Sequence, residues 1–320
     1  MLEALRFVQG AIAKKDLVAA LTHFRIQDGE VKGYNGMIAL RSPIPLNLNV
    51  TPKALPFIKA IQTCRDTVSL HVTPKGKLAV ASGGFKAFVE CLPDAYPDVN
   101  PEGPRVELEP GLLAALKTLL PFVSEDASRP WSRGILLRGQ SAFATNNVVL
   151  VEYWLPAPAP IVVNLPKAAV VELVRIGEDP VALQMTETNV TFHFTGGRWL
   201  RTQTFSSEWP DLAAILNRGP GEQLPILDGF WEAVEDLAPF VGPISALYLR
   251  NGSMSTTRGE DEGASQDVPG LVAEGVFNIE YLRLLEDVAV TADFIHTGSP
   301  VSLFFGDRLR GAIAGLRHAE

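Results

Sequence analysis

The stretch FTGGRWLRTQTFSSEWPDL, residues 194–212, repeats the outline of ASGGFKAFVECLPDAYPDV, residues 81–99. Gly83-Gly84 and Gly196-Gly197 lie 113 residues apart, and the aromatic-Pro-Asp triplets that follow them are separated by the same 113 residues. A glycine pair between two alternating segments is typical of a turn between strands. Two distant parts of the chain therefore share one structural outline.

The match extends upstream of both stretches. Residues 67–82 and 180–195 share the 113-residue offset without a gap, and each predicts a strand, a four-residue turn and a second strand. Residues 51–62 and 165–176 precede them at an offset of 114, and both predict a helix opened by proline. Helix, hairpin, glycine pair, strand and Pro-Asp in one order indicate a duplicated unit.

A third copy is fainter. Helical segments that end in Phe-Val recur at residues 5–10, 120–125 and 238–243. The segment FNIEYLRLLEDVAV, residues 277–290, predicts the second helix of this copy, and residues 300–316 predict its closing strands. The chain is therefore expected to contain three copies of the same unit.

These copies predict three similar α+β domains, 1–105, 106–218 and 219–320, in which helices pack on antiparallel sheets. Both boundaries fall in polar sequence rich in proline and glycine, NPEGPR and NRGPGE, as linkers do. The repeat is too long for a solenoid of small units, so each copy is expected to be a domain.

The composition indicates a folded protein outside the membrane. Of the 320 residues 47% are hydrophobic, yet no apolar run approaches the length of a membrane span. The N-terminal segment lacks the pattern of a signal peptide. Cys64 and Cys91 have neither metal nor redox spacing, which fits a reducing compartment. We expect a cytoplasmic protein without a cofactor or metal.

The order of these landmarks resembles the bacterial-type DNA sliding clamp, the beta subunit of the replicative DNA polymerase. Residues 128–153 are similar to the family's segment that ends in Ala-Thr-Asp-Gly-His-Arg-Leu. A Pro-Lys helix and WPDLAAIL, residues 209–216, follow in the family's order, and FNIEYL, residues 277–282, is similar to its Phe-Asn-x-x-Tyr helix. The resemblance covers essentially the whole chain and indicates a divergent member, of cellular or viral origin.

The resemblance implies three similar clamp domains, each with two helices packed on antiparallel sheets, in a ring formed by a head-to-tail homodimer. Such a ring encircles double-stranded DNA without reading its sequence, and it tethers DNA polymerase and other replication and repair proteins. Polymerase and clamp loader bind through short hydrophobic peptide motifs. The resemblance implies no enzymatic activity, and a separate ATP-driven loader would open the ring.

The charge is uneven along the chain. The net charge is −8, and it divides into +4 for residues 1–105, −2 for 106–218 and −10 for 219–320. A ring needs positive potential only where its helices face phosphates. The first helix of the third repeat is acidic and only Arg283 lies on its second helix, so DNA contact by that repeat is left open.

The candidate DNA-facing cations lie on or beside the helices of the first two repeats. By resemblance, the loops that hold Lys14-Lys15 and Arg129 approach the DNA. The alternative for each residue is an ordinary solvated charge. The candidates are Arg6, Lys14, Lys15, Lys53, Lys59, Lys117, Arg129, Lys167 and Arg175.

By resemblance, a hydrophobic pocket between the second and third domains receives partner peptides. Asn147-Val148 replaces the family's Gly-His, Ala214 replaces a basic residue and Ser132 an apolar one, so the peptide preference is expected to differ. The apolar positions could equally belong to the core. The carried-over residues are Thr145, Asn147, Val148, Leu150, Pro210, Ile215, Ala314, Leu316 and Arg317.

Phe240 and Val241 are candidates for the dimer interface. Opposite charges on the first and third repeats would steer a head-to-tail contact between two copies. The alternative places Phe240 in the core, because Phe7 and Phe122 occupy the same position in the other repeats.

Two other classes of function stay open. One is an interaction scaffold that does not enclose DNA, which the −10 third repeat favours. The other is a hydrolase or lyase whose site is assembled from loops. The five histidines show no metal spacing, and the sequence has neither a phosphate-binding loop nor a nucleophile elbow. We therefore do not expect an enzyme.

Overall fold

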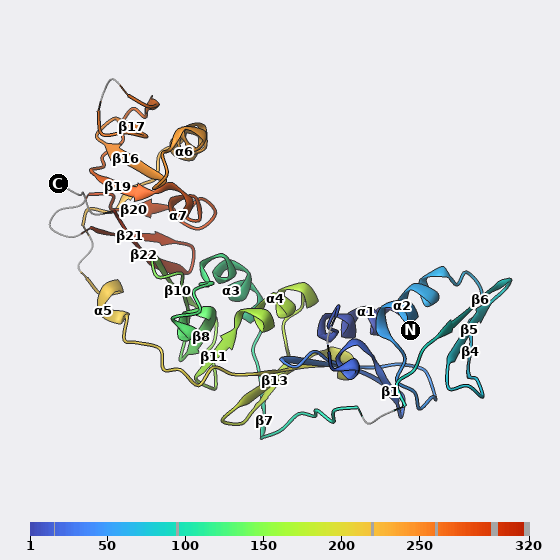
Figure 1. Cartoon of the computed structure of the whole chain (residues 1–320). Helices are drawn as coiled ribbons and strands as arrows, with labels where there is room; N and C mark the ends of the chain where they lie inside the picture. Colours follow the sequence, from blue (N-terminus) through green and yellow to red (C-terminus); the bar gives the residue numbers. More distant parts are fainter. Residues whose placement is uncertain (16, 94–95, 219–220, 260–261, 296–299, 317–320) are drawn as a thin grey trace. The chain divides into compact units, whose positions relative to one another are not determined.

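The computed structural model describes residues 1–320 except 16, 94–95, 219–220, 260–261, 296–299 and 317–320. The chain divides into two compact units (Figure 1). The first contains residues 1–113 and 168–206, and the second contains residues 114–167 and 207–320. Each unit joins strands from neighbouring sequence repeats. The domain boundaries near residues 105 and 218 therefore stay a prediction.

The first unit contains a large antiparallel sheet that spans two repeats. Leu40 of β3 pairs with Leu200 of β14, and this pairing joins strands of repeat 1 to strands of repeat 2. In spatial order the strands are β1 (Arg25–Gln27), β2 (Glu30–Tyr34), β3 (Ile38–Pro43), β14 (Trp199–Gln203), β13 (Asn189–His193), β12 (Ala182–Met185) and β7 (Arg105–Glu107).

A smaller sheet of the same unit consists of β4 (Ser69–Val72), β5 (Leu78–Ser82) and β6 (Phe85–Val89). Gly83, with φ +55°, lies in the tight turn between β5 and β6, where the glycine pair was predicted. The predicted alignment of residues 67–82 with residues 180–195 without a gap is wrong by one residue. Val72 pairs with Leu78, whereas the equivalent Met185 pairs with Val190, so the turn in repeat 1 is one residue longer.

The second unit repeats this arrangement. Leu150 of β10 pairs with Ala312 of β22, which joins strands of repeats 2 and 3 in one sheet. In spatial order this sheet contains β11 (Val163–Pro166), β8 (Gly134–Arg138), β9 (Ser141–Thr145), β10 (Val149–Trp154), β22 (Leu309–Ala314), β21 (Val301–Gly306), β20 (Thr291–Ala292) and β15 (Leu224–Pro225). A second sheet has the order β18 (Ser265–Asp267), β17 (Ser253–Ser255), β16 (Ala246–Arg250) and β19 (Gly275–Asn278).

The helices follow the predicted repeat. The first helix of each repeat is extended by a 3₁₀ turn. The Phe-Val pair lies just before this turn in repeat 1, whereas its Phe ends the turn in repeats 2 and 3. The α-helices are α1 (Leu2–Val8), α2 (Ala54–Thr63), α3 (Leu112–Leu119), α4 (Lys167–Ile176), α5 (Ala213–Leu216), α6 (Phe230–Leu237) and α7 (Ile279–Arg283). The 3₁₀ turns are Gln9–Ala11, Ala19–Thr22, Leu120–Phe122, Pro130–Arg133, Thr195–Gly197 and Ala238–Phe240.

The second helix of repeat 3 is shorter than its sequence predicts. The expected segment extends to residue 290, but α7 ends at Arg283. The backbone then tightens, because Leu285 and Val288 donate to the carbonyls three residues before them. The helix pair and antiparallel sheets predicted for the repeats are otherwise confirmed. Each helix buries one face, as Phe57 and Ile58 do on α2.

Candidate functional site

Repeat 1 presents a group of exposed cations on or beside its helices. Lys53 precedes α2 and Lys59 lies on it, and both are exposed opposite the buried face of that helix. Arg6 on α1 and Lys14-Lys15 beyond it are also exposed. Within the part of the chain that the structure describes, these five side chains form no ion pair. Their full charge is available to an anionic partner such as a phosphate backbone.

Repeat 2 has fewer free cations. Lys117 is exposed on α3, but Lys167 forms an ion pair with Glu125. The Arg129 guanidinium donates to Asn147 Oδ1 at 3.0 Å. Sequence counts alone therefore overstate the free positive charge of this repeat.

The Arg175 side chain makes its contacts within the fold. Its Nε donates to the buried carboxylate of Glu172 at 2.9 Å, and its Nη2 donates to the backbone oxygen of Phe7 at 2.7 Å. Because Phe7 lies in the last turn of α1, the guanidinium satisfies a carbonyl that this turn leaves open. Arg175 therefore joins α4 to α1, and its role toward DNA stays a prediction with reduced support.

The packing around Glu172 predicts the effect of substituting Gly10. A Cβ at Gly10 would lie 1.9 Å from Glu172 Oε1, and Arg175 holds that carboxylate in place. Gly10→Ala is expected to lower the free energy of unfolding by about 1–3 kcal/mol, measured by urea denaturation. Gly84→Ala is the matched control, because a Cβ there meets nothing within 4 Å. Equal stability of the two variants would contradict this packing.

Repeat 3 has no comparable cation on its helices. Arg283 on α7 donates to both carboxylate oxygens of Glu235 on α6, at 2.5 and 2.7 Å. Glu235 and its neighbours Glu280 and Glu286 raise the pKa of the already basic Arg283. The helix pair therefore pairs its arginine internally and presents carboxylates, and DNA contact by repeat 3 stays an open prediction.

An apolar cluster lies in the second unit at the predicted peptide site. Its buried centre is made by Leu150, Leu216, Leu303 and Ala312. The partly buried side chains packed against this centre are Phe143, Trp209, Leu212, Ile215, Val301 and Phe305. Because half-buried aromatic and aliphatic groups surround a buried centre, this surface suits hydrophobic anchors of a peptide.

The structure brings most predicted pocket residues together. Leu150 and Ile215 belong to the apolar cluster. Thr145 Oγ1 accepts from the Asn147 N–H and donates to Val149 O, which fixes the turn that holds Asn147 at φ +74°. Ala314 N donates to Val148 O at 2.9 Å, so the last strand borders this turn.

The remaining predicted positions are less central. Pro210 is exposed beside Trp209. The backbone N–H of Leu316 donates to Val276 O, which places this residue beside β19. Arg317 lies outside the described residues. The role of all these residues in peptide binding stays a prediction.

Sequence reasoning missed several members of the cluster. The Trp131 and Trp209 rings pack edge to face with centroids 5.1 Å apart, although the two residues are far apart in the chain. Val301, Leu303 and Phe305 alternate along β21 on one face of the sheet. That alternation was a usable signal, because apolar residues at every second position of a strand share a face.

An ion pair with a buried carboxylate supports the cluster. Arg310 Nε on β22 donates to Glu152 Oε2 on β10 at 2.7 Å, and Ser141 donates to the other carboxylate oxygen at 2.6 Å. The Arg310 side chain also donates to Leu216 O at 3.2 Å, at the end of α5. The same arginine therefore joins repeats 2 and 3 and holds the helix that covers the cluster.

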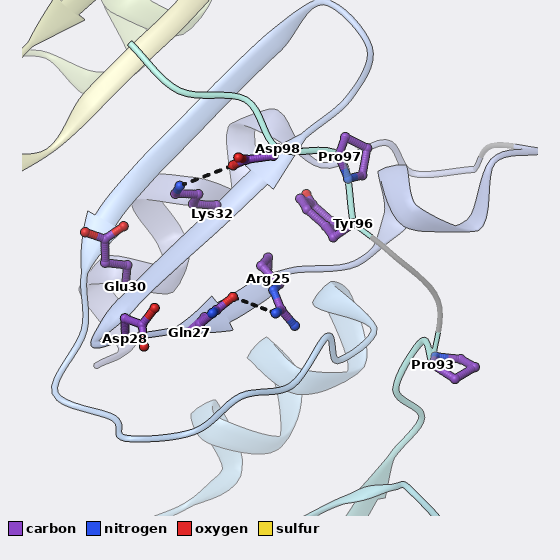
Figure 2. A pocket seen from close by; sticks show the side chains of 9 residues that line it. All are labelled: Arg25, Gln27, Asp28, Glu30, Lys32, Pro93, Tyr96, Pro97 and Asp98. Atoms are coloured by element: carbon purple, nitrogen blue, oxygen red, sulfur yellow. Dashed lines mark hydrogen bonds and ion pairs between the residues drawn. The ribbon is translucent and has the colours of Figure 1, made fainter.

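The equivalent face of repeat 1 is polar. Arg25, Gln27, Glu30 and Lys32 of the β1–β2 hairpin border a pocket of about 670 Å³, together with the Tyr96-Pro97-Asp98 segment, Asp28 and Pro93. Figure 2 shows the hydrogen bond from Arg25 to Gln27 and the ion pair between Lys32 and Asp98. Desolvation raises the pKa of the Tyr96 phenol, whose hydroxyl donates to His23 O. Its lining is charged and polar, with Lys32 paired to Asp98, so this pocket does not reproduce the apolar cluster.

The hydrogen bond between Glu30 and Arg41 predicts that part of the free energy of unfolding is lost in acid. Its hydrogen bond to Arg41 holds the pKa of the Glu30 carboxyl below its usual value of 4.5. A depressed folded-state pKa contributes stability above the usual value, and that contribution is lost as the pH falls through the folded-state pKa. Urea unfolding at pH 6 and pH 3.5 is expected to show a smaller pH-dependent loss for Glu30→Gln than for the unmodified chain. Identical losses would contradict this role for Glu30.

Among the described residues, no group of three or more His, Cys, Asp or Glu side chains could hold a metal ion. No helix within the described ranges is long and apolar enough to cross a membrane.

Repeated helix pairs on antiparallel sheets, with each large sheet shared by consecutive repeats, make up the fold of the DNA sliding clamps. Solved structures similar to this chain include bacterial beta clamps. That of Caulobacter crescentus has a TM-score of 0.85 at 19% identity, and that of Bacillus subtilis has 0.84 at 17%. The Bartonella birtlesii DNA polymerase III subunit beta, bound to griselimycin, has 0.83 at 17%. In each case the match covers 99% of this chain and 97% of the other. No family model and no curated protein sequence matches the chain.

Proposed function

We propose that this chain is a DNA sliding clamp, which forms a head-to-tail homodimeric ring around double-stranded DNA and tethers DNA polymerase and other replication and repair proteins. The observation that carries the proposal is the way in which consecutive repeats share sheets. The full-length likeness to bacterial beta clamps supports the same conclusion.

The sheets follow one rule. Early strands of repeat 1 pair with late strands of repeat 2 through β3 and β14, and early strands of repeat 2 pair with late strands of repeat 3 through β10 and β22. The late strands of repeat 1, which end in β6, have no such partner among the described residues. The early strands of repeat 3, which end in β18, have none either. A second copy placed head to tail supplies a partner for β6 and a partner for β18. Two such contacts between two copies close a ring.

The rule also gives the register of the contact. Arg41 of β3 faces Trp199 of β14, and Glu152 of β10 faces Arg310 of β22. Ser265 on β18 is the repeat equivalent of Arg41 and Glu152, and Lys86 on β6 is the equivalent of Trp199 and Arg310. We therefore infer that Lys86 of one copy faces Ser265 of the other, with antiparallel strands.

Exposure of Phe240 supports the same contact. Phe7 is only 7% exposed because it packs against Phe194 in the late part of repeat 2, with ring centroids 5.9 Å apart. Phe122 is 1% exposed, but Phe240 is 63% exposed. The core alternative for Phe240 is therefore wrong. Within one chain no following repeat is present to cover Phe240, and the late part of repeat 1 of a second copy would cover this side chain. Val241 is the next residue and would lie at the same contact.

Mechanistically, the ring would hold DNA by enclosure, so tight binding is not required. Exposed cations of repeat 1 and Lys117 would give weak contacts to phosphates that do not depend on sequence. Polymerase and loader peptides would compete for the apolar cluster centred on Leu150. The proposed role involves no catalysis and no bound cofactor, and it takes place in the cytoplasm. A loader that hydrolyses ATP would open one interface.

Light scattering in moderate salt tests this proposal first. We expect a mass of twice 34.6 kDa. The opposite charges of repeats 1 and 3 also predict that dimer association slows as salt increases. A stable monomer at micromolar concentration would leave the fold intact but would favour a scaffold that does not enclose DNA.

A further inference from the structure

The β1–β2 hairpin of repeat 1 and the β8–β9 hairpin of repeat 2 carry different side chains at the same position. Counted from the turn, Arg25 and Lys32 occupy the places of Leu136 and Phe143, and in each hairpin the two residues lie directly opposite each other. Phe143 belongs to the apolar cluster of the second unit. Repeat 1 therefore places a cation pair, Arg25 and Lys32, where repeat 2 places an apolar pair.

No carboxylate lies close to either member of the cation pair. Arg25 donates to neutral oxygens, of which the nearest is Gln27 Oε1 at 2.6 Å, and it forms no ion pair among the residues that the structure describes. The Lys32 ammonium donates to Asn100 at 2.6 Å, whereas the exposed Asp98 carboxylate is 4.0 Å away. Like charges directly opposite each other on neighbouring strands repel, so an anion bound between these two cations would be stabilising.

The cation pair borders a pocket of about 670 Å³, a volume typical of ligand-binding clefts. The Tyr96 ring lines the pocket, and its hydroxyl donates to a backbone oxygen, which fixes this wall. Figure 2 shows Asp28 and Glu30 at the turn end of the hairpin, away from Tyr96. Arg41 neutralises Glu30, whereas Asp28 is exposed and has no ion pair in the described part of the chain. The pocket therefore offers two cations in one part and an unpaired carboxylate in another.

This arrangement of charges indicates the class of ligand. The continuous negative charge of a nucleic-acid backbone would be repelled by Asp28, Glu30 and Asp98 around the pocket. Residues directly opposite each other have Cβ atoms about 5 Å apart, so one carboxylate can reach both members of the cation pair. Asp28 lies three residues from Arg25, about 10 Å along the strand. A basic side chain two residues from the acidic one, about 7 Å away in an extended peptide, has a stem long enough to reach Asp28.

We propose that this pocket binds an extended polar peptide segment of a partner protein, with a glutamate between Arg25 and Lys32 and a basic residue two positions away at Asp28. Such a segment differs from the hydrophobic motifs proposed for the cluster around Leu150, so the two sites select different partners. The inference rests on the comparison of the two hairpins, and it does not depend on whether the chain encircles DNA.

Fluorescence polarisation with labelled synthetic peptides tests the proposal on the full chain at low salt. The probe is Gly-Ser-Glu-Ser-Lys-Ser-Gly, and the matched control is Gly-Ser-Gln-Ser-Lys-Ser-Gly. The glutamate peptide is expected to bind at least tenfold more tightly, because only its carboxylate pairs with both cations. Equal affinities, or no binding of the glutamate peptide at the highest soluble protein concentration, would overturn the proposal. This comparison needs no variant of the protein.

Substitutions then locate the site. Arg25→Gln is expected to weaken binding of the glutamate peptide at least tenfold, and Asp28→Asn at least threefold. Arg65→Gln, at an exposed position of the same unit, is the control and should leave the affinity unchanged. A labelled thymidine oligonucleotide distinguishes the two anionic partners, because Arg25→Gln should not change its binding. Loss of oligonucleotide binding with unchanged peptide binding would assign Arg25 to nucleic acid and contradict the peptide site.

Discussion

Phe240→Asp is expected to convert the proposed dimer into a monomer of 34.6 kDa. Phe240 is 63% exposed in the isolated chain, whereas Phe194 in the late part of the next repeat packs on its equivalent Phe7. A carboxylate buried at that contact would lose its hydration without gaining a partner. Dimer dissociation should be at least ~30-fold more favourable, which corresponds to about 2 kcal/mol for a central aromatic contact. Analytical ultracentrifugation across a concentration series measures the change.

Val290→Asp is the matched control for this substitution. Val290 belongs to the same repeat and is 62% exposed, but it adjoins β20 rather than the proposed contact. The control should dimerise like the unmodified chain. A dimer that tolerates Phe240→Asp, or that is equally weakened by both substitutions, would rule out this interface.

Arg310→Met is expected to produce the largest loss of stability. Arg310 neutralises Glu152, which is 7% exposed, and it also donates to Leu216 O at the end of α5. Removing one partner leaves a buried carboxylate uncompensated, so the free energy of unfolding should fall by about 3–5 kcal/mol. Because α5 loses its anchor, binding of hydrophobic partner peptides should weaken as well.

The double variant Glu152→Gln/Arg310→Met separates charge from packing. Glutamine removes the unpaired charge while still accepting from Ser141, so it should recover a large part of the lost stability in urea denaturation. Equal stability of the single and double variants would mean that the ion pair does not hold these strands. Arg133→Met, at an exposed position of the same unit, provides a control for arginine loss at the surface.

The repeat and its helix pair could be predicted from the sequence, because turn glycines, Pro-Asp segments and apolar periodicity are local signals. The joining of β3 to β14, and of β10 to β22, could not. Those pairings are set by contacts between residues more than 150 apart, which no local pattern records. The one-residue difference between the two hairpin turns was hidden for a similar reason, since only the pairing of Val72 with Leu78 defines it.

In the candidate site, too, some features follow from local sequence signals and others depend on distant contacts. Lys59 lies opposite the buried face of α2, and the sequence predicted Lys53 and Lys59 from their place on or beside this helix. The hydrogen bonds of Arg175 to Glu172 and to the Phe7 carbonyl depend on how α4 packs beside α1. The cluster around Leu150 likewise combines strands of two repeats with α5, so resemblance found part of it and periodicity could have added β21. Side-chain partners across the fold are what sequence patterns leave out.

Covalent closure around a circular plasmid tests the central claim most directly. In a chain whose Cys64 and Cys91 are replaced by serine, Lys86→Cys and Ser265→Cys should cross-link across both contacts of a dimer assembled in the presence of nicked circular DNA. After denaturation in detergent, the cross-linked protein should stay with the circle and leave it once a restriction enzyme cuts the DNA. Cross-linked protein that separates from intact circles would show that the chain does not encircle DNA.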